Sequence, residues 1–282
     1  DYFYVTDAQI GGVKAASIPN GGYFLGMTGN YWLRETEKVQ DVDKKTGELK
    51  VDKDGNPVMV DKEIEGGRYQ IDAATGLYKL QGNTTNVVGN REPKLIGGLT
   101  SNFRWKDLSF SFLFDFRMGG DIYNGTQYYL TSLGQSMRTL DRTQITFEGV
   151  DCNTMEPMTV TYKAGETYEI NGSVRSGEYM IQSYWSNYCS NAYNFLQKVN
   201  WLRLRNINLS YDFSNLIKGQ DVLKGLVATF TANNLFYVTN YVGGMDPEAS
   251  MGSGTGGSGS VGIEYCGVPS LRSFSFGLNL TF

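Results

Sequence analysis

Apolar and polar residues alternate along the C-terminal segment 270–282, whose sequence is SLRSFSFGLNLTF. One parity carries small or polar residues, and the other carries the apolar residues Phe274, Phe276, Leu278, Leu280 and Phe282. This period of two predicts a β-strand with one face against an apolar medium and the other among polar neighbours. In a soluble β-sandwich the apolar face would meet a second sheet, whereas in a membrane-spanning β-barrel it would meet lipid.

The same alternation recurs in segments 94–105 and 108–118. In the second of these, LSFSFLFDFRM, the apolar parity runs without interruption from Leu108 to Met118, and the opposite parity includes charged residues. A strand with an uninterrupted apolar face and a charged opposite face is more typical of a barrel, with lipid outside and water inside, than of a sandwich core. We therefore predict that four polar side chains face the lumen of a barrel: Lys94, Arg104, Asp115 and Arg117.

Segments 201–213 and 226–236 complete the set of predicted spans, and the connections between spans alternate in length. Long connections precede residues 94, 201 and 270, and short ones follow residues 105 and 213. Such alternation is typical of an antiparallel barrel with periplasmic turns and extracellular loops. Arg203 and Arg205 occupy the otherwise apolar parity of their span, so either they lie beyond the bilayer edge or a β-bulge switches faces there.

These patterns predict an all-β chain that forms part of an antiparallel transmembrane β-barrel with long extracellular loops. We expect residues 1–93 to form one or more barrel strands and a long extracellular loop or hairpin excursion. Residues 94–282 should form barrel strands with extracellular loops at about 125–199 and 239–269, because neither loop contains a comparable strand pattern. A calcium-like run at Asp52, Asp54 and Asn56 has its glycine misplaced and lacks the closing glutamate, which favours an ordinary turn.

Composition narrows the classes of function. The 282 residues include no histidine, so Ser-His-Asp or Cys-His catalysis and imidazole-ligated metal sites cannot form within this chain. A mean hydropathy of -0.32 and the lack of a long apolar run argue against membrane-spanning helices. The net charge of -4 comes without a basic cluster, which argues against nucleic acid binding. No carboxylate pair or nucleophile constellation indicates an enzyme, and no cofactor is expected.

The chain has three cysteines without CxxC spacing: Cys152, Cys189 and Cys266. Neither a zinc site nor a disulfide framework is therefore indicated, although one bridge between Cys152 and Cys189 stays open. The chain begins at Asp1 without a methionine or a leader sequence, which favours a piece of a longer protein.

Several segments resemble one family in order and spacing: PKLIGGLTSNFRWKDLSFSF, MGGDIYNGT, FLQKVNWLRLRNINLSYDF and ANNLFYVTNYVGGMDPE. Together with the terminal strand ending in phenylalanine, they resemble the C-terminal portion of SusC/RagA-type TonB-dependent outer-membrane transporters of Bacteroidota. Residues 67–90 depart from the acidic, glycine-containing segment that such proteins often carry before the first of these matches. The N-terminal carboxypeptidase-like module, the TonB box and the plug domain are not found in this chain.

The resemblance implies a large barrel, with about 22 strands in the complete protein. It also implies TonB-dependent import of oligosaccharides or oligopeptides across the outer membrane, with a SusD-like lipoprotein as a surface partner. The alternatives are a passive or structural outer-membrane barrel without TonB coupling and a secreted β-sandwich adhesin.

By the same resemblance, the C-terminal aromatic residues Phe274, Phe276 and Phe282 form the signal recognised by the barrel-assembly machinery. Loop residues that could face substrate or the lipoprotein lid are Tyr128, Tyr129, Tyr184, Trp185, Tyr188, Asp246 and Glu248. For the aromatic residues the alternative is that they pack on one another. For Asp246 and Glu248 the alternative is a rigid Asp-Pro turn.

Overall fold

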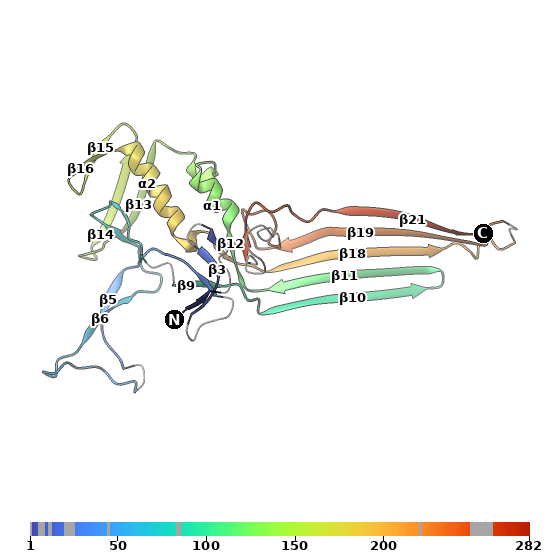
Figure 1. Ribbon diagram of the computed structural model, residues 1–282, viewed down its shortest axis with the longest axis horizontal. Helices are drawn as coiled ribbons and strands as arrows, with labels where there is room; N and C mark the ends of the chain where they lie inside the picture. The colour runs from blue at the N-terminus through green and yellow to red at the C-terminus, as the bar shows by residue number, and fades with distance from the viewer. Residues whose placement is uncertain are drawn as a thin grey trace.

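The computed structural model describes residues 2–4, 9–10, 13–19, 26–43, 46–82, 86–219, 222–248 and 262–282. It has two parts: a long antiparallel sheet, and a body of shorter strands and helices gathered at one end of that sheet (Figure 1). Residues 249–261, within the loop predicted at about 239–269, lie outside the described residues.

The long sheet has five strands in the order β10, β11, β18, β19 and β21, all antiparallel to their neighbours. The strands are β10 (Leu95–Trp105), β11 (Leu108–Met118), β18 (Trp201–Asp212), β19 (Gly225–Thr239) and β21 (Ser273–Thr281). Each of the five predicted spans is therefore confirmed as a strand. In the described part of the chain β10 and β21 are the outer strands, so this sheet is an open segment of a barrel wall.

Turn chemistry and one bulge set the register of the long sheet. β10 and β11 join through Lys106 and Asp107, and Lys106 has a φ of 53°, which suits a tight hairpin turn. The pairing of β18 shifts against β11 and against β19 at Arg205, which has no cross-strand partner in either ladder. This bulge turns Arg203 onto the face of Asp115, its partner in register. Of the two explanations left open for these arginines, the face-switching bulge is the one observed.

The two faces of the sheet differ as predicted. Phenylalanine rings contact one another along one face, with centroids 5.8 Å apart for Phe110 and Phe112 and 5.5 Å apart for Phe112 and Phe114. The other face carries a ladder of amide and hydroxyl groups, in which Asn233 joins Asn206 at 2.8 Å and Ser273 at 3.0 Å. Phe276 is 83% exposed, and the apolar face around it is the kind of surface that lipid covers.

No helix among the described residues has both the length and the apolar character needed to cross a membrane.

Among the described residues, the body consists of four small sheets, a separate hairpin, and helices. Its N-terminal strands are β1 (Tyr2–Tyr4), β2 (Gln9–Ile10), β3 (Val13–Pro19), β4 (Gly26–Thr28), β5 (Thr36–Gln40), β6 (Met59–Glu63), β7 (Gln70–Asp72), β8 (Leu77–Tyr78) and β9 (Val87–Asn90). Its later strands are β12 (Asp121–Asn124), β13 (Gln144–Asp151), β14 (Pro157–Lys163), β15 (Thr167–Ile170), β16 (Ser173–Ser176), β17 (Leu196–Lys198) and β20 (Ile263–Glu264). The helices are α1 (Gly125–Ser132), η1 (Met137–Thr139), α2 (Gly177–Ser190) and η2 (Ala192–Asn194).

Strands far apart in sequence meet in this body. The sheet β14-β13-β7-β8 joins residues 70–78 to residues 144–163, and the sheet β17-β12-β20 joins two connections of the long sheet, the one between β11 and β18 and the one between β19 and β21. β5 and β6 form a separate hairpin, which matches the predicted hairpin excursion. At its tip, Asp52 Oδ1 accepts hydrogen bonds from the backbone N–H groups of Asp54 at 2.9 Å and Asn56 at 2.8 Å. The ordinary turn is therefore confirmed.

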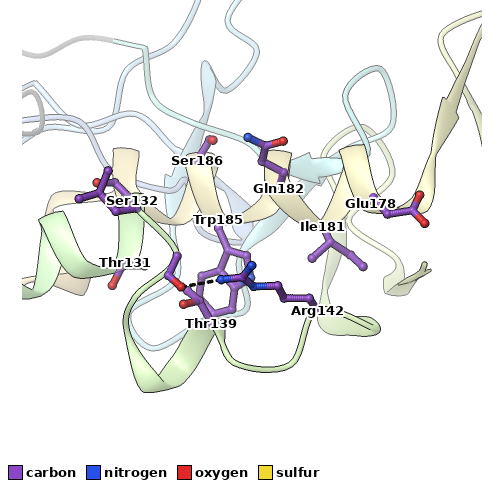
Figure 2. Close-up of a pocket in the computed structure, with 11 residues that line it drawn as sticks. Thr131, Ser132, Thr139, Arg142, Glu178, Ile181, Gln182, Trp185 and Ser186 are labelled. Carbon is purple, nitrogen blue, oxygen red and sulfur yellow. Dashed lines mark hydrogen bonds between the residues drawn. The ribbon is translucent and has the colours of Figure 1, made fainter. Parts of the chain in front are cut away.

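The expectation that residues 125–199 lack a comparable strand is wrong. The segment contains the hairpin β13–β14, the shorter hairpin β15–β16 and both α-helices. In α2 the buried residues Met180, Ile181 and Cys189 recur at helical spacing, which a search for period-two alternation cannot detect. Helix α1 contacts α2, and residues of both helices, including Trp185 of α2, line a cavity (Figure 2).

Two larger hydrophobic clusters hold the body together among the described residues, and a smaller one around Ile122, Val199 and Trp201 lies where the body meets the long sheet. One of the two larger clusters surrounds Tyr123 and Phe195 and includes residues of the first strands. The other surrounds Trp32, Tyr78 and Phe147 and packs against α2. No strand before β10 pairs with the long sheet among the described residues, so the barrel strand expected within residues 1–93 stays a prediction.

Candidate functional site

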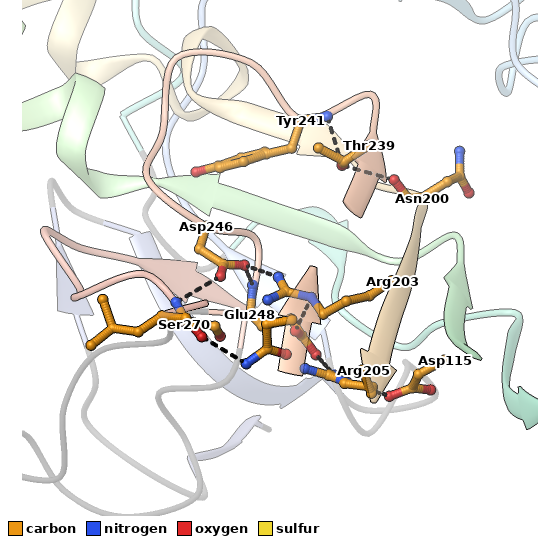
Figure 3. A network of polar contacts seen from close by, with 11 residues as sticks. Asp115, Asn200, Arg203, Arg205, Thr239, Tyr241, Asp246, Glu248 and Ser270 are labelled. Carbon is orange, nitrogen blue, oxygen red and sulfur yellow. Dashed lines mark hydrogen bonds and ion pairs between the residues drawn. The ribbon is translucent and has the colours of Figure 1, made fainter. Parts of the chain in front are cut away.

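A buried arginine stands at the junction of the long sheet and the body. Arg203 of β18 is 2% exposed and pairs with two carboxylates, Asp246 at 2.7 Å and Glu248 at 2.9 Å. The bulge at Arg205 is what turns the Arg203 side chain toward these acids. Figure 3 shows both carboxylates reaching Arg203 from the chain that follows β19.

Arg205 extends this arrangement across the sheet. Its guanidinium pairs with Asp115 of β11 at 3.0 Å and also with Glu248. We call Asp115, Arg203, Arg205, Asp246 and Glu248 the acid–arginine cluster. Two arginines face three carboxylates, and each charge has a partner, as buried charges require.

The acid–arginine cluster holds two points of the chain between β19 and β21, one at Glu248 and one at Ser270. Asp246 Oδ1 accepts from the Glu248 N–H at 3.0 Å, and its Oδ2 accepts from the Ser270 N–H at 3.2 Å, just before β21. Burial alone would raise the pKa of Asp246, but these N–H donors and the Arg203 guanidinium hold that pKa below its ordinary value. Asp246 is therefore a carboxylate at neutral pH that ties two loop ends to the wall.

This geometry bears on the two interpretations of Asp246 and Glu248. The hydrogen bond from the Glu248 N–H to the Asp246 side chain forms an Asx turn, so the turn is confirmed. Asp246 is 1% exposed and offers no surface to a partner, which disfavours a lid contact for this residue. A lid or substrate contact of Glu248 stays a prediction.

A cavity of about 300 Å³ adjoins the acid–arginine cluster. Its polar lining comes from Asp115, Arg117, Trp201, Glu248 and Glu264. Trp201 is 8% exposed, and its indole N–H has no hydrogen-bond partner among the described residues. The cavity thus combines charges of both signs, an arrangement that suits a polar ligand or a polar protein segment.

Glu264 is buried beside this cavity with hydroxyl partners. Its Oε1 accepts from Thr126 Oγ1 at 2.8 Å, and its Oε2 accepts from the Tyr241 hydroxyl at 3.2 Å. Burial and the Glu264 charge raise the pKa of Tyr241, so that hydroxyl stays protonated and can donate. These contacts hold β20 and the chain after β19 against α1.

The structure brings together only part of the predicted lumen-facing set. Asp115 and Arg117 line the same cavity, and Arg117 donates to the backbone carbonyls of Arg91 at 2.8 Å and Gly119 at 3.2 Å. Arg104 lies at the far end of the polar face, near the β10–β11 turn. Lys94 lies in the connection before β10 and is exposed. Their roles in a complete barrel stay predictions.

Sequence reasoning missed Trp201, Glu264 and the pairing of both arginines with the Asp-Pro-Glu segment. The sequence did contain a signal for this pairing, because two arginines on the apolar parity of a strand need carboxylate partners once they are buried. Pairing them required knowledge of the fold, since Arg203 and Asp246 are 43 positions apart.

The predicted ligand-facing aromatic residues mostly pack on one another. Tyr184 lies 4.9 Å from Phe147 between ring centroids, and Tyr129 lies 4.7 Å from Tyr265. Tyr128 and Tyr188 both pack against Phe195, at 5.6 Å and 5.8 Å. Trp185 packs on Tyr184 and Tyr188 and also lines the cavity of Figure 2. Ligand contact by these residues stays a prediction, and the alternative of mutual packing is observed.

All three cysteines are free, so the open bridge between Cys152 and Cys189 is not formed. Cys189 is 5% exposed within the body, and burial raises the pKa of its thiol to about 11. It is therefore an inert packing residue at neutral pH.

An antiparallel sheet with an apolar outer face, a polar inner face and a body at one end defines a segment of an outer-membrane β-barrel wall. No family model matches the chain. The TonB-dependent receptor P39 of Formosa agariphila is 27% identical over 255 residues, covering 90% of this chain and 21% of the receptor. The TonB-dependent receptor P3 of the same organism is 24% identical over 200 residues, covering 70% of this chain and 17% of the receptor.

Solved structures that match the chain include two states of the RagAB peptide importer. The open-open state matches with a TM-score of 0.47 and 17% identity, covering 100% of this chain and 24% of that one. The closed-closed state matches with a TM-score of 0.42 and 20% identity, covering 94% and 24%. Both curated relatives are TonB-dependent receptors, in agreement with the predicted resemblance to TonB-dependent transporters. This chain spans about a fifth of the length of the curated relatives that it matches.

Proposed function

We propose that the protein carrying this chain imports oligosaccharides or oligopeptides across the outer membrane in a TonB-dependent cycle. The observation that carries the proposal is the two-faced sheet, apolar outside and polar inside, whose inner face ends in the acid–arginine cluster. Similarity to TonB-dependent receptors over 90% of the chain supports it. The five strands would form part of the barrel wall, and the body would stand on the extracellular side as the loop region.

The acid–arginine cluster has a mechanical task in this proposal. A transporter must keep its outer loops in place while a substrate passes through the barrel and while other parts of the protein move. Arg203 and Arg205 lie on one strand of the wall, β18, and Asp246 and Glu248 lie in the connection that follows β19. The cluster therefore fastens the loop region to the wall at the mouth of the barrel.

The partners follow from the same proposal. A SusD-like surface lipoprotein would cover the loop region and hold substrate against it, and TonB would act through an N-terminal region outside this chain. The barrel-assembly machinery would recognise the terminal strand, whose residues Phe274, Phe276 and Phe282 are all exposed and which is an outer strand of the sheet in the described part of the chain.

Uptake by cells that express the complete protein tests the proposal. A labelled mixture of oligosaccharides and oligopeptides should accumulate in these cells, and accumulation should stop when TonB is deleted or the proton-motive force is collapsed. Uptake that continues without TonB would support a passive barrel instead. A complete protein that stays monodisperse in buffer without detergent would contradict both barrel functions and favour the secreted adhesin.

A further inference from the structure

The β5–β6 hairpin is the base of a longer arm that reaches from residue 36 to residue 63. The arm projects from the body on the side away from the long sheet (Figure 1). Beyond the paired strands it forks into two smaller turns, each marked by one bridge, Val42 with Leu49 and Val51 with Pro57. The arm therefore consists of three short antiparallel pairs that meet at one point.

The three pairs meet at Asp41, Lys50 and Val58. Their backbones form a closed cycle of hydrogen bonds: the Asp41 N–H donates to the Val58 carbonyl at 2.7 Å, the Val58 N–H to the Lys50 carbonyl at 3.0 Å, and the Lys50 N–H to the Asp41 carbonyl at 2.8 Å. The Lys50 ammonium group also pairs with the Asp41 carboxylate at 2.7 Å, so both side chains lie on the same side of the arm. We call this side the charged face.

The residues next to this junction point to the opposite side, because successive side chains of a strand alternate between its two faces. Five of them are apolar and surround the junction: Val42, Leu49, Val51, Pro57 and Met59. We call these five residues the apolar ring. Leu49 is 61% exposed and Val51 is 58% exposed, and no member of the ring belongs to a hydrophobic cluster of the described residues. A group of exposed apolar side chains on a projecting arm indicates a protein contact.

The acidic excess of the arm lies on the charged face and not beside the apolar ring. By register, the charged face carries five acidic residues and two lysines, a formal charge of -3: Glu37, Asp41, Asp43, Glu48, Asp52, Lys50 and Lys62. The face of the ring carries Lys38, Asp61 and Glu63, a formal charge of -1, and the first two of these pair at 2.9 Å. The ring therefore lies on a nearly neutral face.

We propose that the apolar ring docks onto the apolar ring of a second copy of this protein. In a two-fold contact of this kind each residue meets the same patch of the other copy, which an apolar, nearly neutral surface permits. The Lys38 ammonium group of one copy would face the Asp61 carboxylate of the other, since each ring face carries one of each. Both charged faces would point outward into water, so the acidic excess of the two arms stays apart.

Charge disfavours the other occupants of this surface. A basic protein would be attracted to the charged face, which leaves the apolar ring uncovered. An anionic lipid surface needs a basic excess beside the apolar residues, and the described residues of the ring face have none. The second copy is the partner whose charge and polarity match this face.

The contact is small. Five side chains cover less than the roughly 800 Å² per partner of a standard interface, so the contact would be weak between two proteins free in solution. Two copies held in one membrane meet at a higher effective concentration, so the contact is best measured in intact cells. It concerns assembly and does not depend on TonB or on transport.

Cysteine crosslinking of the complete protein tests the proposal, in cells that express two differently tagged copies. Neighbouring strands lie about 4.8 Å apart, so each residue of the ring would lie within about 10 Å of its equivalent in the other copy. With Leu49→Cys in both copies, a flexible bismaleimide should yield a covalent dimer that carries both tags. Val60→Cys is the matched control, since Val60 is an exposed apolar residue on the charged face of the same arm. It should give no more dimer than the protein with its natural cysteines alone.

A second substitution tests whether the ring itself makes the contact. Val42→Asp in the Leu49→Cys protein places an unpaired charge in the contact of each copy and should lower the dimer yield about tenfold or more. Val60→Asp in the same background should leave the yield unchanged. Yields are compared per amount of protein assembled in the membrane, so a loss of folding does not count as a loss of contact.

Four results would overturn the proposal. They are the absence of a dimer carrying both tags, equal dimer yields from Leu49→Cys and Val60→Cys, a dimer yield that Val42→Asp does not change, and crosslinking of Leu49→Cys to a different protein in place of a second copy. Because none of these readouts involves uptake, the proposed function stands or fails separately.

Discussion

The pair between Arg203 and Asp246 should determine whether the loop region stays attached to the wall. Both side chains are 2% exposed, so Asp246→Ala leaves a buried arginine with only Glu248 as a partner. It also removes the acceptor for the Ser270 N–H. Breaking a buried ion pair by removing one partner costs about 3–5 kcal/mol.

The control is an exposed pair of the same type. Lys38 and Asp61 lie 2.9 Å apart on the β5–β6 hairpin, with side chains 68% and 58% exposed. Exposed pairs contribute about 0–1 kcal/mol, so Asp61→Ala should have little effect. Asp246→Asn keeps an acceptor oxygen but loses the charge, and its effect should fall between the two.

Hydrogen exchange of the complete protein in detergent measures the local effect. If Asp246→Ala lowers the free energy of local opening by about 3 kcal/mol, amides of residues 240–248 should exchange about 100-fold faster. Amides in the centre of β19 should keep their wild-type rates, because the sheet ladder does not depend on the pair. Equal exchange rates in residues 240–248 for Asp246→Ala and Asp61→Ala would refute the reasoning.

Acid should weaken the same attachment. The folded-state pKa of Asp246 lies below the ordinary value of 3.8, so its contribution is present above pH 3.8 and is lost as the pH falls through the folded value. This chain contains no histidine that could titrate between pH 5 and pH 7. Exchange in residues 240–248, corrected for its intrinsic pH dependence, should therefore rise only below about pH 4. A rise between pH 7 and pH 5 would contradict the assignment.

Three further predictions concern the wall and the thiols. Phe112→Lys places a charge on the lipid face and should cost about 2–4 kcal/mol, lowering the folded fraction in outer membranes, whereas Ser111→Lys on the polar face should not. Phe282→Ser should reduce the amount of protein assembled in the outer membrane, and unchanged assembly would contradict its sorting role. A maleimide at pH 7 should label the exposed Cys266 much faster than Cys189, whose pKa is raised to about 11, and equal rates would contradict the burial of Cys189.

Local pattern was enough to predict the wall of this protein. Period-two alternation placed all five long strands, because each strand faces an apolar medium on one side and polar groups on the other along most of its length. The short turn at Lys106 and Asp107 was also predictable, since tight connections leave few residues between two alternating runs. The family resemblance rested on segments of the same region, and the comparisons confirm it.

The body was less predictable, because its elements depend on contacts between distant segments. β13 pairs with β7, about 80 residues earlier in the chain. Helix α2 is only weakly amphipathic, so the aromatic residues in its sequence resemble those of a loop. Packing partners from both ends of the chain decide which of these aromatic rings are buried. Strand periodicity alone therefore predicted a loop at residues 125–199.

By itself the sequence determined which segments form the wall, which face of each strand is apolar, and that two arginines interrupt one apolar face. Only the tertiary structure decided how those arginines are neutralised. The bulge at Arg205 rotates Arg203 onto the polar face, and the connection after β19 returns Asp246 and Glu248 to meet it. A buried strand can carry a charge only where the fold places an opposite charge beside it. Here the opposite charge is on Asp246, 43 positions from Arg203.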